Sequence, residues 1–189
     1  MNTNSAILDI KKARALTQLL WIGIGSIGMF FAGLTSAYIV RKAEGNWLEF
    51  SVPESFVFST AVIIISSLLL IYIKTKIKNN DTPFLFMLSV IILGIFFAVF
   101  QINGWKELTS QGVFLTGEGS NVSGSFLYVI TLAHLAHLFG GLIALVIVSV
   151  NVFKKKYNAN NYLGFNLAAN YWHFLGVLWL YLFLFFNYI

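Results

Sequence analysis

The chain has 189 residues, of which 58% are hydrophobic, 17% aromatic and only 10% charged. Soluble domains carry about 25% charged residues, so this composition excludes a water-soluble protein and indicates a membrane protein. The net charge is +5, but the basic residues lie in short segments between long apolar runs, where they serve topology, and no nucleic-acid partner is predicted. Cysteine is absent, which excludes disulfides, thiolate metal sites and cysteine nucleophiles.

Five apolar runs are each long enough to cross the hydrocarbon of a bilayer, which takes about 20 helical residues. We place these spans at residues 16–40, 54–73, 84–103, 122–151 and 162–188, and we treat residues 1–189 as a single transmembrane domain. The predicted fold class is therefore all-α, a polytopic membrane helix bundle with five transmembrane helices. Pro53 and Pro83 suit the first turns of the second and third helices, because the first turn of a helix has a spare N–H position.

The basic residues predict the orientation of the bundle. With the N-terminus inside, nine Lys and Arg residues lie in the inner segments and three in the outer ones. By the positive-inside rule, the N-terminus lies inside and, after five spans, the C-terminus lies outside. The inner residues are Lys11, Lys12, Arg14, Lys74, Lys76, Lys78, Lys154, Lys155 and Lys156, and the outer ones are Arg41, Lys42 and Lys106.

The first span carries small residues at spacings of three and four. They are Gly25, Gly28, Ala32 and Ser36, and we call them the small-residue ridge. Small residues let helices approach closely, so we predict that the ridge packs inside the bundle. The alternative is that another protein subunit packs against the ridge, because five helices with little polar content offer no ligand pocket of their own.

Ionisable side chains are scarce at depth: no Asp, Glu, Lys or Arg lies clearly within a span. Pumps and proton relays need such groups, and many transporters show internal repeats that this sequence lacks. Both observations argue against a transporter. In the third span, Gln101 is expected to form a hydrogen bond with a neighbouring helix, and a functional role is the alternative.

Three histidines are the candidate ligands of a metal or haem. In the fourth span His134 and His137 are three residues apart and share a face that Gly140 and Gly141 continue. In the fifth span Asn166, Asn170 and His173 follow at i, i+4 and i+7, and a polar stripe in lipid must face protein.

His134 and His173 both fall near the middle of the membrane and are close enough in depth to meet. Zinc would need a third or fourth ligand, and a haem needs axial histidines from opposite faces, so only a pair that includes His173 would serve. We predict instead neutral, hydrogen-bonded imidazoles, with His173 joining its helix to the His-x-x-His helix. A stand-alone haem- or metal-binding membrane protein is the alternative of another class.

Three segments, in order, carry a family resemblance. They are MFFAGLTSAYIVRK (residues 29–42), SFLYVITLAHLAHLFGG (125–141) and YWHFLGVLWLYLF (171–183). They resemble subunit III of the haem-copper oxidases, the group of cytochrome c oxidases and quinol oxidases. The most specific feature is the opening Tyr171, Trp172 and His173 together with the His-x-x-His helix. The resemblance covers nearly the whole chain from Gly25 on and is closest to the short, five-helix bacterial form.

The resemblance implies an accessory subunit of a respiratory oxidase that transfers electrons from cytochrome c to oxygen, in a bacterial inner membrane. It implies that subunit I holds the haems and copper, that subunit II accepts the electrons, and that subunit III binds lipid, stabilises subunit I and supports proton uptake. No catalytic, cofactor or metal residue is then expected in this chain. Bound phospholipid and membership of a larger supercomplex stay open, as do a quinol oxidase and a nitric oxide reductase as the parent enzyme.

Two departures from the family pattern limit what the resemblance implies. Longer members carry a buried glutamate before the Met-Phe-Phe-Ala-Gly run, where this chain has Ile27. They also commonly carry an aspartate one residue after Tyr-Trp-His-Phe, where this chain has Gly176. Roles attached to those two carboxylates do not transfer to this chain.

Overall fold

The computed structural model describes residues 3–45, 47–48, 50–117, 119–159 and 161–189. Within them the chain forms α1 (Thr3–Ala43), α2 (Glu54–Lys78), α3 (Phe84–Ser110), α4 (Val122–Phe153) and α5 (Leu163–Tyr188). Each of these five helices is long and apolar enough to cross a membrane. The prediction of an all-helical membrane bundle is thus confirmed, as lipid requires of backbone groups that must bond within their own segment.

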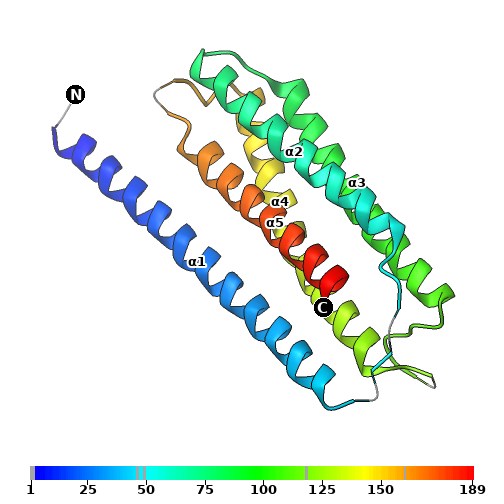
Figure 1. Ribbon diagram of the computed structural model, residues 1–189. Coiled ribbons are helices and arrows are strands. Elements are labelled where there is room, and N and C mark those ends of the chain that lie inside the picture. Colours follow the sequence, from blue (N-terminus) through cyan, green and yellow to red (C-terminus); the bar gives the residue numbers. More distant parts are fainter. Residues whose placement is uncertain (1–2, 46, 49, 118, 160) are drawn as a thin grey trace.

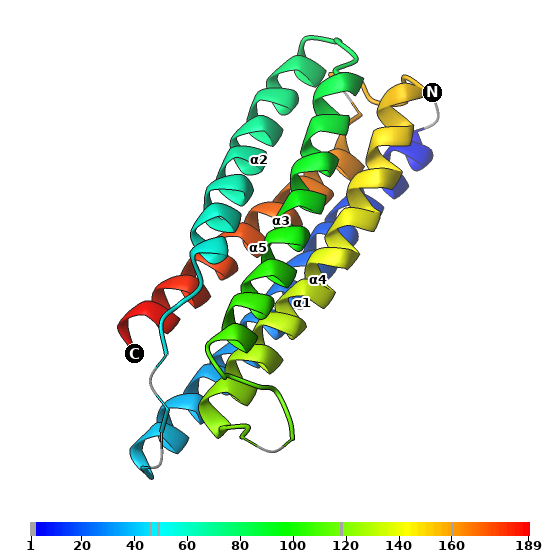
Figure 2. The same cartoon turned by 90° about the vertical axis from the view of Figure 1, so that its right-hand side faces the viewer.

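Four helices form a ring and the first lies against its side. α2 packs on α3, α3 on α4, α4 on α5, and α5 on α2, while α1 contacts α4 and α5. Figure 1 shows α5 between α1 and α2, and Figure 2, turned by 90°, shows α1 behind α4. One side of α5 therefore faces outward between α1 and α2.

The helices are longer than the hydropathy predicts. α1 has 41 residues, of which the segment Ile10–Ala43 qualifies as a span, against the predicted 16–40. α2 and α3 continue to Lys78 and Ser110 instead of ending at residues 73 and 103. At about 1.5 Å per residue, α1 reaches about 60 Å, twice the hydrocarbon thickness. Hydropathy finds where the lipid ends, but Ala, Leu, Lys and Arg continue a helix into water.

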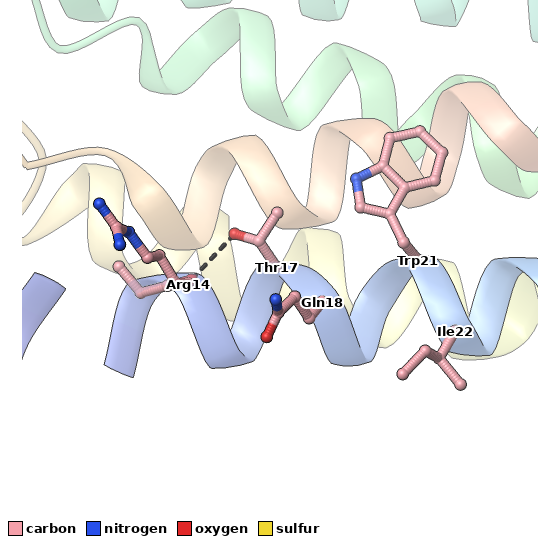
Figure 3. A pocket seen from close by; sticks show the side chains of 6 residues that line it. Arg14, Thr17, Gln18, Trp21 and Ile22 are labelled. Carbon is pink, nitrogen blue, oxygen red and sulfur yellow. Dashed lines mark hydrogen bonds between the residues drawn. The ribbon is translucent and has the colours of Figure 1, made fainter. Parts of the chain in front are cut away.

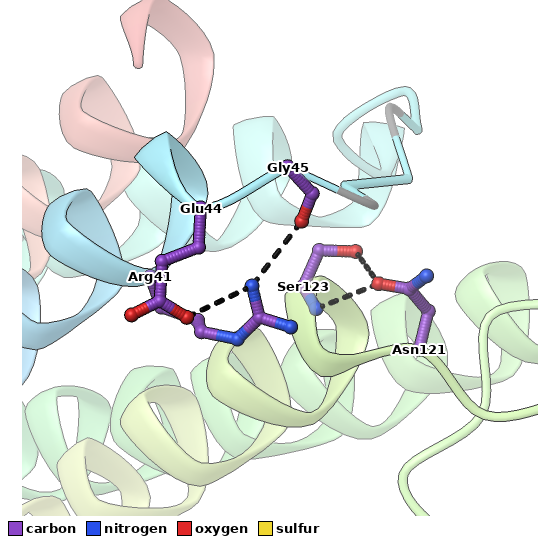
Figure 4. A network of polar contacts seen from close by, with 5 residues as sticks. All are labelled: Arg41, Glu44, Gly45, Asn121 and Ser123. Carbon is purple, nitrogen blue, oxygen red and sulfur yellow. Dashed lines mark hydrogen bonds and ion pairs between the residues drawn. The ribbon is translucent and has the colours of Figure 1, made fainter.

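Local residues set several helix ends. Pro53 and Pro83 directly precede α2 and α3. The Asn121 side chain accepts a hydrogen bond from the backbone N of Ser123 at 3.0 Å and so caps α4. At the end of α1, the Arg41 guanidinium lies 3.4 Å from the Glu44 carboxylate and donates to the backbone oxygen of Gly45 (Figure 4).

The centre of the ring is built around two tryptophans of α5. Trp172 and Trp179 are fully buried, and each indole donates a hydrogen bond of 2.9 Å to α2, to Ser66 and to Thr60 respectively. Lipid offers little hydrophobic drive for helix association, so such bonds and close packing hold the helices together.

Two glycines make room for the first indole. A Cβ added at Gly94 of α3 would lie 2.7 Å from the Trp172 ring, and one at Gly141 of α4 would lie 3.2 Å from it. Trp172 is therefore wedged between α3 and α4 while it bonds to α2, so a single side chain of α5 ties together all four helices of the ring.

Candidate functional site

His134 lies at the centre of an aromatic cage. The ring has no exposed surface, and its centroid is 5.3 Å from that of Trp179, 5.8 Å from Phe97 and 6.2 Å from Phe31. Neither ring nitrogen has a hydrogen-bond partner. The prediction of a hydrogen-bonded imidazole is therefore wrong for His134, because the three helices around it present rings at this depth. A charged ring would be costly there without a counter-charge.

His137 connects α4 to α1. Its Nδ1 lies 2.7 Å from the backbone oxygen of Ala133, one turn back in the same helix, so this nitrogen donates. The other side of the ring faces Phe31 and Phe30 of α1, with centroid distances of 5.6 and 6.3 Å. Since Phe31 also contacts His134, one aromatic side chain of α1 covers both histidines.

Tyr171, Trp172 and His173 point to three different sides of α5, as consecutive helical residues must at about 100° per residue. The Tyr171 hydroxyl donates to the backbone oxygen of His137 at 3.2 Å. His173 makes no hydrogen bond or ring contact among the described residues and lies instead within electrostatic range of Lys74 in α2. The structure corrects the expected junction, because Tyr171 and not His173 joins α5 to the His-x-x-His helix.

Asn166 and Asn170 lie on the same side of α5 as His173, and all three are half-buried. The Asn166 Oδ1 is buried and has no partner. Asn170 and His173 make no hydrogen bond among the described residues. The stripe is thus partly covered inside this chain, and the contact of its remaining surface with protein stays a prediction.

Gln101 is buried in α3, and its Nε2 donates to the Ser59 hydroxyl of α2 at 2.9 Å. The predicted bond to a neighbouring helix is present. The Oε1 of Gln101 has no partner. Ser59, Thr60 and Ser66 lie on the buried face of α2, and each takes part in a bond from a longer polar side chain. Sequence reasoning missed them, although hydroxyls recurring on one face of an apolar helix are a usable signal.

The small-residue ridge does not pack within this chain. Gly25, Ala32 and Ser36 are exposed, and a Cβ added at Gly25 or Gly28 would meet nothing within 4 Å. α1 instead packs through a different side, with Phe31, Thr35 and Tyr38 buried. Packing of the ridge inside the bundle is therefore wrong, and its contact with another subunit stays a prediction.

The glycines of α4 differ from each other. Gly141 is buried against Trp172, as predicted for a packing glycine, whereas Gly140 is exposed, with the Tyr171 hydroxyl 4.0 Å from where its Cβ would be.

A surface hollow of about 650 Å³ lies along the first half of α1. Figure 3 shows Arg14, Thr17, Gln18, Trp21 and Ile22 along it. A second hollow of about 410 Å³ lies where α1 diverges from α4 and α5, and its lining includes Leu20, Ala144 and Leu167. A cation and polar side chains beside apolar ones have the chemistry of a phospholipid contact, and the first hollow combines Arg14, Thr17 and Gln18 with Trp21 and Ile22.

The three histidines do not converge on one point. The described residues contain no group of three or more His, Asp or Glu side chains able to hold a metal ion. His134 is enclosed by rings and His137 faces α1, whereas His173 has no ring contact with either of them among the described residues. Their arrangement does not fit a shared zinc ion or a haem with two axial histidines.

The fold and the site together define a multi-pass membrane helix bundle whose polar groups mostly serve helix packing. The family model for cytochrome c oxidase subunit III matches residues 48–189. The chain is 29% identical over 191 residues to cytochrome c oxidase subunit 3 of Corynebacterium diphtheriae, covering 92% of this chain and 91% of that protein. This chain belongs to the cytochrome c oxidase subunit III family.

Two further relatives carry the same subunit name. The chain is 31% identical over 163 residues to the probable cytochrome c oxidase subunit 3 of Mycobacterium bovis, covering 82% of this chain and 78% of that protein. It is 26% identical over 170 residues to cytochrome c oxidase subunit 3 of Bacillus sp. strain PS3, covering 86% and 80%. The predicted family is confirmed, and with it the place of this chain in a multi-subunit oxidoreductase.

Proposed function

We propose that this chain is the accessory, non-catalytic subunit III of a haem-copper terminal oxidase that transfers electrons from cytochrome c to oxygen. Its task is to stabilise subunit I and to support proton uptake. The match to the subunit III family over residues 48–189 carries this proposal. Its support in the bundle is that four polar side chains hold helices together through hydrogen bonds: Trp172, Trp179, Gln101 and Tyr171.

In this proposal the haems and copper reside in subunits I and II. The parent complex lies in a bacterial inner membrane, with the N-terminus of this chain inside and its C-terminus outside. The connections α2–α3 and α4–α5 lie at the same end of the bundle as the start of α1 (Figure 1). Asn80 and Ala159 join the two connections through a hydrogen bond of 3.0 Å. Nine basic residues belong to this end, which supports its cytoplasmic placement.

A phospholipid is the ligand that the hollows beside α1 suit best. Arg14 supplies a positive charge for a headgroup, Trp21 has the ring type that favours the membrane interface, and the second hollow is lined mainly by apolar side chains. The two carboxylates that longer members carry are replaced by Ile27 and Gly176, so lipid binding and proton uptake in this chain depend on other groups.

Purification of the tagged full-length chain from its native membrane in a mild detergent tests the proposal. We expect a haem-containing subunit I and a copper-containing subunit II in the eluate, identified by optical spectrum and mass spectrometry. Oxidation of reduced cytochrome c, but not of quinol, by the eluate would identify the donor. A chain that purifies without any oxidase subunit contradicts the proposal, and a Soret band from that isolated chain would favour the stand-alone haem protein.

Removal of the chain tests the supporting role. An oxidase that lacks it should start at a normal rate and then lose activity over many turnovers. An initial rate that falls to zero would instead place a catalytic group in this chain.

A further inference from the structure

The outward side of α5, between α1 and α2, differs from the other outer surfaces of the bundle (Figure 1). Residues 166, 170, 173, 177, 180 and 184 follow each other at spacings of three and four and so share this side. Its first half carries Asn166, Asn170 and His173. Its second half is apolar and exposed, with Val177 67% and Leu184 44% accessible.

The polar half of this side lacks partners inside the chain. Together with Lys74 of α2, which lies within electrostatic range of His173, it forms what we call the α5 polar stripe: Lys74, Asn166, Asn170 and His173. The Asn166 Oδ1 is enclosed by this chain without a hydrogen bond, which leaves the Nδ2 of the same amide to meet a partner. Among the described residues, Asn170 and His173 make no hydrogen bond and Lys74 makes no ion pair, whereas the nearby Lys76 pairs with Asp81 at 3.3 Å.

The outer side of α3 is the natural comparison. It exposes Leu85, Ile92, Ile95 and Val99. Its one exposed hydroxyl near this depth, Ser89, bonds to the backbone oxygen of Leu85 at 3.1 Å and so needs nothing from its surroundings. Lipid chains satisfy such a surface. They cannot satisfy the α5 polar stripe, whose amides and imidazole make no hydrogen bond to the backbone among the described residues, so the stripe requires protein or water against it.

We propose that the outward side of α5, flanked by α1 and α2, is the surface on which the main membrane subunit of the oxidase docks. The α5 polar stripe meets hydrogen-bonding side chains of that subunit, with an acidic group opposite Lys74, while Val177 and Leu184 pack against its apolar surface. The unpaired positive charge of Lys74 supplies the complementarity that selects this partner chemistry over lipid chains. This inference rests on the proposed function, because it names the surface through which the accessory subunit binds.

Photo-crosslinking in the intact complex tests the surface directly. A benzoylphenylalanine replaces Val177 in α5 or, as the matched control, Val99 in α3. Val99 is 44% accessible and lies on the apolar outer surface of α3 that lipid chains satisfy. We expect the probe at 177 to crosslink to the main oxidase subunit and the probe at 99 to give no protein adduct. The inference is overturned if the complex purifies intact but the adduct arises from 99 only, if neither position gives one, or if 177 links to a second copy of this chain.

The proposed function and the proposed docking surface can be tested separately. If the unmodified chain brings down no oxidase subunit and the probe at 177 links to another membrane protein, the proposed function fails, and the oxidase subunit fails with it as the occupant of this surface. If oxidase subunits purify with the chain but link elsewhere, the function stands and the surface is wrong.

Replacing the amides and the imidazole measures their contribution. An interhelical hydrogen bond in a membrane protein is worth about 0.6 kcal/mol, or about threefold in affinity, so Asn166→Leu, Asn170→Leu and His173→Leu together should weaken co-purification roughly 20-fold. The isolated triple variant should melt no lower than the parent, since no bond inside the chain is lost. The control triple Ile95→Leu, Val99→Leu and Ile102→Leu on α3 should bind as the parent does. Unchanged binding by the α5 triple variant would overturn the inference.

Discussion

Gly104→Ala is the most direct test of how closely α3 approaches α2. Gly104 is buried, and a Cβ added there would lie 2.6 Å from Cδ1 of Phe56 and closer still to its Cε1. Phe56 cannot turn away easily, because it is fully buried and its ring packs edge-on against Trp179 at a centroid distance of 5.3 Å. The methyl group therefore forces a movement of the helix or of the ring.

The size of the effect follows from two opposing terms. Overpacking of a closed core by one carbon costs about 1–3 kcal/mol, and replacing glycine by alanine inside a helix returns up to about 1 kcal/mol. Because the added Cβ overlaps a buried ring, the cost lies in the upper part of this range, about 2–3 kcal/mol, and the net loss is then about 1–2 kcal/mol. For a chain of this size that lowers Tm by about 2–8 °C.

Thermal unfolding of the purified chain in detergent, followed by tryptophan fluorescence and circular dichroism, measures this shift. Gly25→Ala is the matched control, because nothing lies within 4 Å of its added Cβ, and its Tm should stay the same or rise. Equal Tm values for Gly104→Ala and the parent would refute the close approach of α3 to Phe56. A drop for Gly25→Ala instead would place the tight helix contact on α1.

Three further substitutions test single side chains by the same melting assay. His134→Leu loses no hydrogen bond and removes a buried polar ring, so the Tm of this variant should equal or exceed that of the parent. A fall in Tm of more than about 4 °C would show that the imidazole has a hydrogen-bond partner inside the aromatic cage. Ser66→Ala removes the hydrogen bond from the Trp172 indole and should cost about 1 kcal/mol, whereas Trp172→Phe also removes part of a buried ring and should cost more. The double variant should lose no more stability than Trp172→Phe alone, and additive losses would contradict a direct bond. Asn121→Ala removes the cap of α4 and should cost about 1 kcal/mol, while Asn121→Ser should keep most of that stability. Equal Tm values for the parent and both variants would show that the cap contributes nothing.

Hydropathy predicted the number and order of the helices because lipid imposes a strict demand on backbone groups. It could not predict their full length, since the residues beyond the hydrocarbon obey helix propensity in water. α1 shows this most clearly, with its span beginning at Ile10 where the apolar run alone suggested residue 16.

Spacing predicted which residues share a side of a helix, but not which neighbour that side meets. The small-residue ridge and the buried residues Phe31, Thr35 and Tyr38 both follow helical spacing in α1. Small size favours close approach wherever a partner exists, and nothing in the ridge says whether that partner is in the same chain. The aromatic residues decide which side of α1 packs in the structure, because Phe31 contacts both His134 and His137.

The same limit explains the outcome for His173. Its type and depth suggested a contact with the other histidines, yet one step along α5 turns the side chain by about 100°, and Trp172 already occupies the inward direction. Tyr171 takes the direction of α4 and leaves His173 on the side of α2. Because the large rings of α5 occupy its inward side, its remaining polar side chains lie on the other sides of the helix. In lipid that arrangement requires protein or water against the polar groups, and the proposed docking of an oxidase subunit on the polar half of α5 would supply it.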